Sequence, residues 1–240
     1  MKLIICTLAL LFLYNCNSGK ESKDGQPAQN NDSIIGQIEL GDTLTIVMDT
    51  VKIDEVYANE IKPHIDKWLK YYDLDINDFR HYTRRTLHIE AMKTDTTYPY
   101  YGTFQPEDDV YNPILFDYSP DKSKYVNHFA SLYVGLEEDG KYYFRGSDDS
   151  QQLYLFDRKG KSKVMISFRG ISQFADAIFW VDNDTFALVG YDSIDAPGMY
   201  LLEIYDLKKD ICDKYILRKE YGKEESYGMV EMKSRGIIID

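Results

Sequence analysis

The residues of this chain that most often carry catalysis or bind metals are few and scattered. Its four histidines are His64, His81, His88 and His128, and no two of them have the helical spacing of three or four residues that places two imidazoles on one metal. The chain contains no Gly-x-Ser-x-Gly motif, no Gly-rich phosphate-binding loop and no dinucleotide-binding fingerprint. The sequence therefore predicts no catalytic residue, no metal site and no cofactor, and it predicts surface positions for the histidines.

Three groups of closely spaced acidic residues are candidates for a metal site or for carboxylate catalysis, and each is predicted to be a turn. The segment Asp73–Asn77 begins like a calcium loop, but Asp78 stands where that loop needs glycine and Arg84 stands where it needs a bidentate glutamate. The pairs Asp108–Asp109 and Asp148–Asp149 offer the two carboxylates of a glycosidase, which must flank one bond from opposite sides. Adjacent residues on a loop cannot do that, so solvated turns are favoured.

Aromatic residues on a loop are a second kind of candidate. The segment after Thr97 places Tyr98, Tyr100, Tyr101 and Phe104 close together beside a proline and a glycine. Tyrosine offers a large contact area with little rotamer entropy to lose, so these residues are candidates for stacking on a glycan or gripping a protein partner. The alternative is that they pack against the domain, as most aromatic runs do. The same alternative applies to Tyr142–Phe144.

The N-terminus carries a motif of a different kind. Lys2 is followed by the apolar stretch Leu3–Leu13, which is shorter than the roughly 20 residues that span a membrane but suits a secretory signal. It ends in Leu13-Tyr14-Asn15-Cys16, which resembles the lipobox of bacterial lipoproteins. The resemblance implies that residues 1–15 are a signal peptide and that the thiol of Cys16 takes a diacylglycerol. The alternative is a plain secretory signal that is cut elsewhere, for example after Ser18.

The residues that follow support a tether. Residues 16–33 include no large apolar side chain, and such a composition cannot bury enough surface to offset its ordering entropy. The residue after the cysteine is Asn17, not the Asp that marks inner-membrane retention in lipoproteins, so the resemblance implies an anchor in the outer membrane. The expected partner of this end of the chain is thus the lipid membrane, through acylated Cys16.

The charge of the chain restricts its other partners. The formal net charge is −12 at pH 7, and the basic residues are scattered, which excludes nucleic acid as an expected partner. An acidic protein is repelled by an anionic lipid face, so a membrane anchor has to be covalent. Cys212 stands between Ile211 and Asp213 in a predicted strand, where an acidic neighbour raises the pKa of a thiol. No disulfide is predicted, because acylation of Cys16 leaves Cys212 without a partner.

The N-terminal half predicts a hairpin, a helix and a strand. Residues 34–40 and 43–53 flank Gly41-Asp42 as a hairpin. From Asp54 onward apolar residues recur at spacings of three and four as far as Tyr72, which predicts a helix that begins or kinks at Pro63. A capped turn is predicted at Asp75–Arg80, and the alternation over Thr86–Ala91 predicts a strand.

The C-terminal half contains an internal repeat of short strands. Ile114–Val126 and Ala177–Val189 each read as an apolar strand, an acidic turn and a second strand, and Leu153–Gly160 and Leu202–Lys209 supply a third strand to each unit. The difference in spacing predicts an insertion around Gly135–Ser150 in the first unit.

These units resemble the blades of WD40-like and TolB-like β-propellers, especially in the turn Ser119-Pro120-Asp121. The resemblance covers residues 112–217 and implies four-stranded meanders, of which a closed ring needs at least about four. The N-terminal hairpin, the strand at Thr86–Ala91 and a C-terminal strand near Tyr227–Ile239 are expected either to complete degenerate blades or to cap an open sheet.

Taken together, these patterns predict a mainly-β fold, an antiparallel propeller-blade-like meander with one N-terminal helix, in a single domain over residues 34–240. The alternative is an α+β fold with an open antiparallel sheet. The predicted function is a membrane-anchored, non-catalytic binding module of the cell envelope with a protein or glycan partner. The alternative function is a lipid-anchored hydrolase that acts on glycans or another envelope substrate, with carboxylates from positions distant in sequence.

Overall fold

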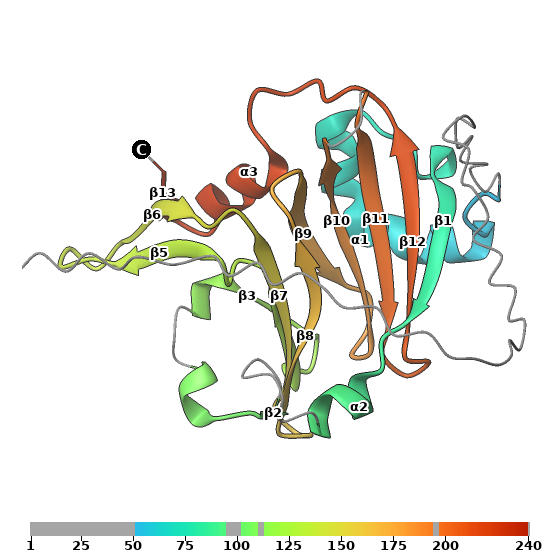
Figure 1. Cartoon of the computed structure of the whole chain (residues 1–240). Helices are drawn as coiled ribbons and strands as arrows, with labels where there is room; N and C mark the ends of the chain where they lie inside the picture. The colour runs from blue at the N-terminus through green and yellow to red at the C-terminus, as the bar shows by residue number, and fades with distance from the viewer. Residues whose placement is uncertain (1–50, 95–101, 110–112, 194–196, 240) are drawn as a thin grey trace, which may run out of the picture. The chain divides into compact units, whose positions relative to one another are not determined.

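Two five-stranded antiparallel sheets carry most of the fold (Figure 1). The computed structural model describes residues 51–94, 102–109, 113–193 and 197–239, and all of them belong to one unit that spans residues 46–240. Helices are few beside these sheets, so the predicted mainly-β antiparallel class is confirmed. The predicted hairpin over residues 34–53 lies outside the described residues except for its last three positions.

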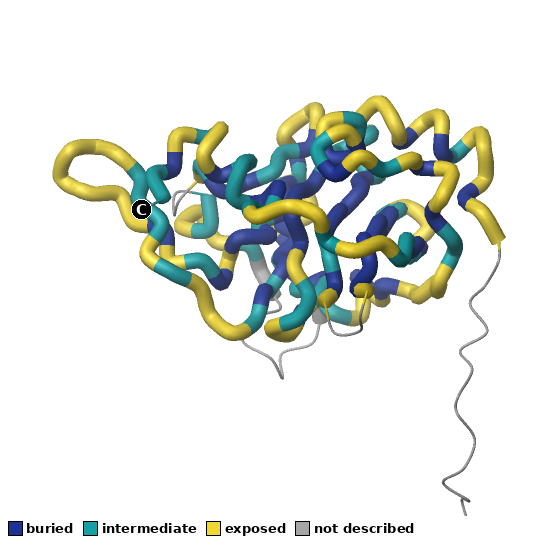
Figure 2. The backbone as a smooth tube through the Cα atoms, turned by 90° about the horizontal axis from the view of Figure 1, so that it is seen from above, coloured by how far each residue is buried: buried dark blue, intermediate teal, exposed yellow. Residues whose placement is uncertain are grey.

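The first sheet is built on a four-strand meander. Its strands in spatial order are β3 (Phe116–Tyr118), β4 (Lys124–Asn127), β7 (Gln151–Asp157), β8 (Ser162–Arg169) and β2 (Gly102–Thr103). Between β4 and β7 the chain leaves the sheet as the hairpin of β5 (Leu132–Leu136) and β6 (Tyr142–Ser147), where the sequence predicts an insertion. The tip of this hairpin is exposed (Figure 2), and β13 (Ile237–Ile238) pairs with β6 in parallel.

The second sheet repeats the meander without an insertion. Its strands in spatial order are β9 (Gln173–Trp180), β10 (Thr185–Asp192), β11 (Met199–Asp206), β12 (Ile211–Arg218) and β1 (Arg80–Thr86). The first four follow one another along the chain, and β1 adds at the outer edge of β12. The two predicted repeat units coincide with these two meanders.

Corresponding positions of the two meanders carry corresponding side chains. Tyr125 of β4 stacks on Phe156 of β7 with ring centroids 4.5 Å apart, and Phe186 of β10 stacks on Tyr205 of β11 at 4.6 Å. The turns after the third strands also match, because Asp157 accepts a hydrogen bond from the backbone N–H three residues later, as does Asp206. Four-strand meanders of this kind are the unit from which propeller blades are made; that this chain belongs with propellers stays a prediction.

The two sheets stack in the same orientation. We call the face of each sheet that carries the stacked aromatic pair its front and the opposite face its back. The back of the first sheet, with Val126 and Leu155, packs against the front of the second, with Phe186 and Tyr205, to form the central apolar layer. The front of the first sheet packs against the β5–β6 hairpin and the C-terminal segment.

Helix α1 (Glu55–Tyr72) covers the back of the second sheet. It begins because the Asp54 carboxylate accepts hydrogen bonds from two backbone N–H groups of the first turn, and it ends at Asp73 in the left-handed conformation. It runs through Pro63 from its start at Glu55, so the prediction of a start at Pro63 is wrong. Its buried face includes Trp68, whose full burial is worth about 2–3 kcal/mol.

Two predicted strands are helical instead. The segment predicted as a strand at Thr86–Ala91 ends strand β1 and begins helix α2 (Ile89–Thr94). Leu87 and Ile89 are buried on either side of exposed His88, so the alternation was real, but His88 has φ of 61°, which no strand allows. The predicted C-terminal strand is mostly helix α3 (Tyr227–Ser234), which Ser226 caps. The remaining helical elements are the 3₁₀ turns η1 (Ile76–Asp78), η2 (Pro106–Asp109) and η3 (Pro113–Leu115).

Candidate functional site

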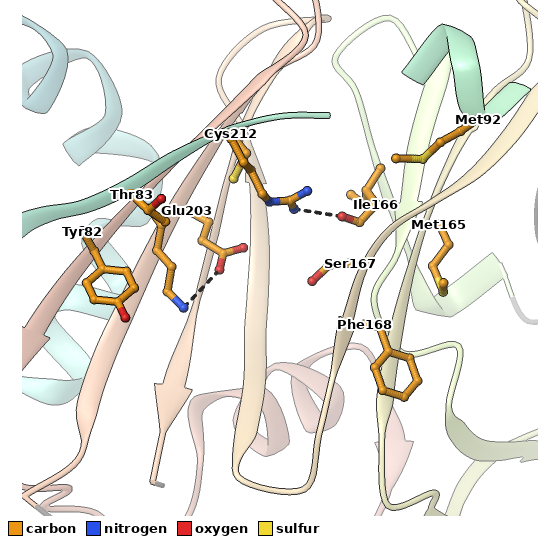
Figure 3. A pocket seen from close by; sticks show the side chains of 11 residues that line it. Tyr82, Thr83, Met92, Met165, Ile166, Ser167, Phe168, Glu203 and Cys212 are labelled. Atoms are coloured by element: carbon orange, nitrogen blue, oxygen red, sulfur yellow. Dashed lines mark hydrogen bonds and ion pairs between the residues drawn. The ribbon is translucent and has the colours of Figure 1, made fainter. Parts of the chain in front are cut away.

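A pocket of about 480 Å³ lies where the outer strands of the two sheets diverge (Figure 3). One wall comes from β1, β11 and β12 of the second sheet, and the other comes from β8 of the first sheet and from α2. The lining residues are Tyr82, Thr83, Arg85, Met92, Met165, Ile166, Ser167, Phe168, Glu203, Cys212 and Lys214. We call this pocket the inter-sheet cleft; its volume is typical of small-ligand sites.

Strand β1 positions the cations of one wall. Its sequence, Arg-His-Tyr-Thr-Arg-Arg-Thr, lacks the apolar alternation of a half-buried strand, yet it pairs with β12 over its whole length. The pairing places Arg85 opposite Cys212 and therefore on the front face, whereas Arg84 lies opposite Asp213 and binds it at 2.7 Å. Arg85 crosses the cleft and donates a hydrogen bond to the carbonyl of Ile166 at 2.9 Å, which ties β1 to β8.

A buried charge cluster forms the floor of the cleft. Glu203 of β11 accepts a hydrogen bond from Arg169 at 2.7 Å and another from the Tyr205 hydroxyl at 2.9 Å, and Lys214 lies 3.9 Å away. Arg169 and Glu203 are almost fully buried. Burial alone would raise the pKa of the Glu203 carboxyl, but Arg169 and Lys214 outweigh it and hold that pKa below its usual range. Glu203 is therefore ionised at neutral pH.

The Tyr205 hydroxyl and the Cys212 thiol, which lie beside Glu203, are uncharged at neutral pH. Burial raises the pKa of the Tyr205 hydroxyl well above 10, and Glu203 adds to the effect. Burial, with a further contribution from Glu203, raises the pKa of the Cys212 thiol to about 12. The sequence predicted a raised pKa from the acidic neighbour Asp213, but the cause is burial, and Asp213 faces Arg84 on the back of the sheet. A thiol with this pKa is a poor nucleophile.

The mouth of the cleft is aromatic and exposed. Figure 3 shows Tyr82 and Phe168 on opposite sides of the opening, and their exposed fractions are 44% and 60%. Met92 and Ile166 line the apolar part of the same wall as Phe168. A methionine side chain adapts to the shape of an apolar partner, and large aromatic side chains that are exposed to water mark surfaces that bind one.

A second polar cluster is built around Asp117 of β3. The Asp117 carboxylate pairs with Nδ1 of His128 at 2.8 Å and with the guanidinium of Arg235. Burial would raise the pKa of the Asp117 carboxyl, but His128 and Arg235 outweigh it and lower that pKa. His128 is fully buried, so the prediction of a surface position is wrong for it, because its partner comes from a strand that the sequence cannot pair with it. This cluster joins α3 to the first sheet, and Asp117 also lines a pocket with His64 and Trp180.

The predicted aromatic site is only partly visible. Tyr98, Tyr100 and Tyr101, like Cys16, lie outside the described residues. Phe104 is half-buried, and its ring packs against Phe156 on the front of the first sheet with centroids 6.4 Å apart. Tyr142 and Phe144 are partly buried against the same cluster. A binding role for the aromatic site stays a prediction.

The acidic segments behave as turns. Asp75 accepts a hydrogen bond from the backbone N–H of Asn77 and caps η1. The pair Asp108–Asp109 is bound by Lys163 and Arg158, and Asp148 accepts a hydrogen bond from Tyr133. Within the described ranges, no group of three His, Cys, Asp or Glu side chains is placed to hold a metal ion.

The residues of the cleft floor were missed by sequence reasoning, although one signal was present. Glu203 is the one charged residue among the buried positions of β11, whose last residue, Asp206, is half-buried, and a charge in a strand that is buried on both faces requires a partner. Its partners Arg169 and Lys214 come from two other strands, so the cluster exists only in the folded chain.

Comparisons of the whole chain with models of known families, with curated protein sequences and with solved structures find no match.

Proposed function

We propose that this protein is a lipid-anchored, non-catalytic binding module of the bacterial cell envelope, and that the inter-sheet cleft is its binding site. The anchor is the diacylglycerol on Cys16, the tether is residues 16–33, and the membrane is the outer membrane. The lipobox-like motif and the polar composition after it support this half of the proposal. None of the helices in the described part of the chain combines the length and the apolar character needed to cross a membrane.

The single observation that supports a binding role is the composition of the cleft. A buried, ionised glutamate and its cations form the floor, and two exposed aromatic rings flank the mouth. Sites that recognise organic ligands combine an apolar wall with a small number of fixed polar groups in this way. The floor is fixed, because Arg169, Tyr205 and Lys214 all surround Glu203.

The same groups are poorly suited to the alternative function of a glycan hydrolase. A glycosidase needs one carboxyl group that stays protonated near neutral pH and a second one across the substrate. Glu203 is the one carboxylate among the described residues that line the cleft, and its pKa is lowered. The Cys212 thiol, with a pKa of about 12, does not supply a nucleophile. These observations favour binding over hydrolysis.

A site-specific cross-linking experiment tests the binding role. In one protein a photo-reactive phenylalanine analogue replaces Phe168 at the mouth of the cleft. In the control protein it replaces Val56, which is 77% exposed and lies on α1, the helix on the opposite face of the second sheet. After irradiation of living cells, we expect the position 168 protein to gain a defined mass that the position 56 protein lacks. Equal adducts at both positions, or none at position 168, would contradict the proposal.

Metabolic labelling tests the anchor. The wild-type chain should incorporate an alkyne-bearing fatty acid and co-fractionate with the outer membrane. The Cys16→Ser variant should lose the label. Cys212→Ser is the matched control, since that thiol is 1% exposed and its loss should leave the label unchanged. A Cys16→Ser variant that still carries the label would rule out lipidation at this residue.

A further inference from the structure

The inter-sheet cleft has a positive charge although the chain as a whole is acidic. The formal net charge of the protein is −12. Arg85 and Lys214 line the cleft and Arg169 lies beneath it, while Glu203 is the one anion among the described residues that line it. Tyr205 and Cys212 are uncharged at neutral pH. The cleft therefore carries more positive than negative charge before any ligand is bound.

Arg169 and Tyr205 both bind one of the two carboxylate oxygens of Glu203. Its Oε2 accepts both the Arg169 guanidinium at 2.7 Å and the Tyr205 hydroxyl at 2.9 Å. Lys214 approaches the other oxygen, Oε1, only to 3.9 Å, which is beyond hydrogen-bond distance. Arg169 is thus the cation closest to Glu203. The ammonium of Lys214 makes no hydrogen bond to Glu203, so its donors remain available to a ligand.

Arg85 also keeps donors for a ligand. Both of the hydrogen bonds that it makes within the described part of the chain, to the carbonyl of Ile166 and to the Tyr205 hydroxyl, leave from the same nitrogen, Nη2. Its Nη1 and Nε are not used by these bonds. A guanidinium held in place by one nitrogen presents the others in a fixed plane, and this geometry suits a carboxylate.

The wall beside these cations is apolar. Met92 and Ile166 lie on it, and the rings of Phe168 and Tyr82 stand at the mouth. The ammonium of Lys214 is 5.5 Å from the centroid of the Tyr82 ring, so the cationic and aromatic parts of the site are in contact. An occupant therefore meets positive charge at one end and apolar surface at the other.

We propose that the inter-sheet cleft binds a small organic carboxylate, with the anion between Arg85 and Lys214 and an aromatic or alkyl body against Met92, Ile166 and Phe168. The inference rests on the proposed function, since it specifies what the binding site takes. A cationic ligand is disfavoured because it would face Arg85 and Lys214 with only the already paired Glu203 to balance them. A divalent metal is disfavoured because it needs several oxygen ligands, and the cleft offers one carboxylate.

The experiment uses the full lipoprotein in phosphatidylcholine nanodiscs, with empty nanodiscs as the blank. Isothermal titration calorimetry compares three probes of nearly equal shape: 3-phenylpropanoate, 3-phenylpropanol and 3-phenylpropylammonium. We expect the carboxylate to bind about tenfold more tightly than the alcohol and the ammonium to bind least, because charge-assisted hydrogen bonds supply the difference.

Substitutions in and outside the cleft test whether the carboxylate binds there. Lys214→Met and Arg85→Gln should each weaken carboxylate binding about tenfold. Methionine is chosen because Met165 occupies the register position of the first meander that Lys214 occupies in the second. Lys219→Met, on an exposed cation outside the cleft, is the control and should leave the affinity unchanged. Thermal unfolding of each variant identifies one that fails to fold, and Arg85→Gln then decides in place of Lys214→Met.

Each outcome separates this inference from the proposed function. Equal binding of the carboxylate and the alcohol, or tighter binding of the ammonium, overturns the assignment of an anion and leaves the cleft as a binding site. An equal loss in Lys219→Met overturns the placement of the carboxylate in the cleft. Binding of no probe, together with a cross-link at position 168, overturns the ligand class alone. Binding of no probe and no cross-link overturns both proposals.

Discussion

Removal of Arg169 from beneath Glu203 is the most direct test of the buried charge cluster. Arg169→Met keeps much of the apolar volume of the side chain but removes the cation that lies 2.7 Å from the carboxylate. At an effective dielectric constant of about 20, the attraction between unit charges is roughly 6 kcal/mol at that distance and roughly 4 kcal/mol at the 3.9 Å of Lys214. Lys214 therefore compensates in part.

The expected net cost is smaller than the Coulomb figure, because the pair also loses hydration when it is buried. Breaking a buried ion pair by removing one partner costs about 3–5 kcal/mol, and the partial compensation by Lys214 places this case near 3 kcal/mol. The double variant Arg169→Met/Glu203→Met removes the buried cation and the buried anion together and leaves Lys214, which solvent still reaches, without its carboxylate; its stability should return to within about 1 kcal/mol of the wild type. Urea denaturation, followed by circular dichroism, measures both differences.

The dependence on pH is a second readout of the same experiment. Since the folded pKa of Glu203 lies below its unfolded value of about 4.3, the pair contributes stability above that pH and loses it as pH falls through the folded pKa. In Arg169→Met the carboxylate is desolvated with less positive charge nearby, so protonation relieves it. The difference from the wild type should therefore shrink between pH 7 and pH 4. A single variant as stable as the wild type at pH 7, or a double variant as unstable as the single one, would refute this account of Glu203.

Three further predictions concern other parts of the molecule. Asp117→Asn removes the anion that His128 and Arg235 share, so urea denaturation should show a loss of about 3 kcal/mol at pH 7. Because the folded pKa of Asp117 lies below its unfolded value of about 3.9, this loss should persist down to about pH 4 and shrink only below it, and a loss that vanishes between pH 7 and about pH 4 would contradict it. Cys212 should resist thiol reagents at pH 8 in the folded protein and react once urea unfolds it, as peptide mass mapping would show, and rapid modification of the native chain would disprove its burial. Gly190→Ala should cost about 3 kcal/mol, because its Cβ would lie 1.9 Å from the carbonyl oxygen of Phe174, whereas Gly170→Ala, which meets open space, should leave the melting temperature almost unchanged.

The sequence predicted the elements whose information is local. The two meanders follow from apolar runs that end at Asp157 and Asp206, each of which accepts a hydrogen bond within its own turn. Helix α1 follows from its periodicity and from the capping residue Asp54. In these cases the residues that determine the structure lie within a few positions of one another.

The elements that it missed depend on distant partners. Strand β1 has no apolar alternation of its own, and it is a strand because β12 offers an edge with Asp213 opposite Arg84. Near residue 88 the alternation of Leu87 and Ile89 arises from a turn and a short helix, since Asp210 accepts hydrogen bonds from the backbone N–H groups of His88 and Ile89. A burial pattern of period two over so few residues does not distinguish these cases.

The site was missed for the same reason. Arg85, Arg169 and Lys214 come from β1, β8 and β12, and they surround a glutamate from a fourth strand. The sequence favoured the contiguous aromatic run that includes Phe104, because contiguous residues are what a sequence displays. In the folded chain Phe104 packs against Phe156, and the exposed aromatic residues at the mouth of the cleft are Tyr82 and Phe168, which stand on different sheets.

The front-to-back stacking of the two sheets has a consequence for self-association. A stack in which each unit offers its back to the front of the next has no symmetry that closes it after two units, so it ends only where something else covers the last face. Here α1 covers the terminal back face, and the β5–β6 hairpin and α3 cover the terminal front face. Head-to-tail growth therefore requires the loss of both covers: without α1 the back would expose Ala187, Leu202 and Ile204, but the front of a second copy would still be closed by the hairpin and α3. The chain is in this sense protected against polymerisation at both ends of its stack.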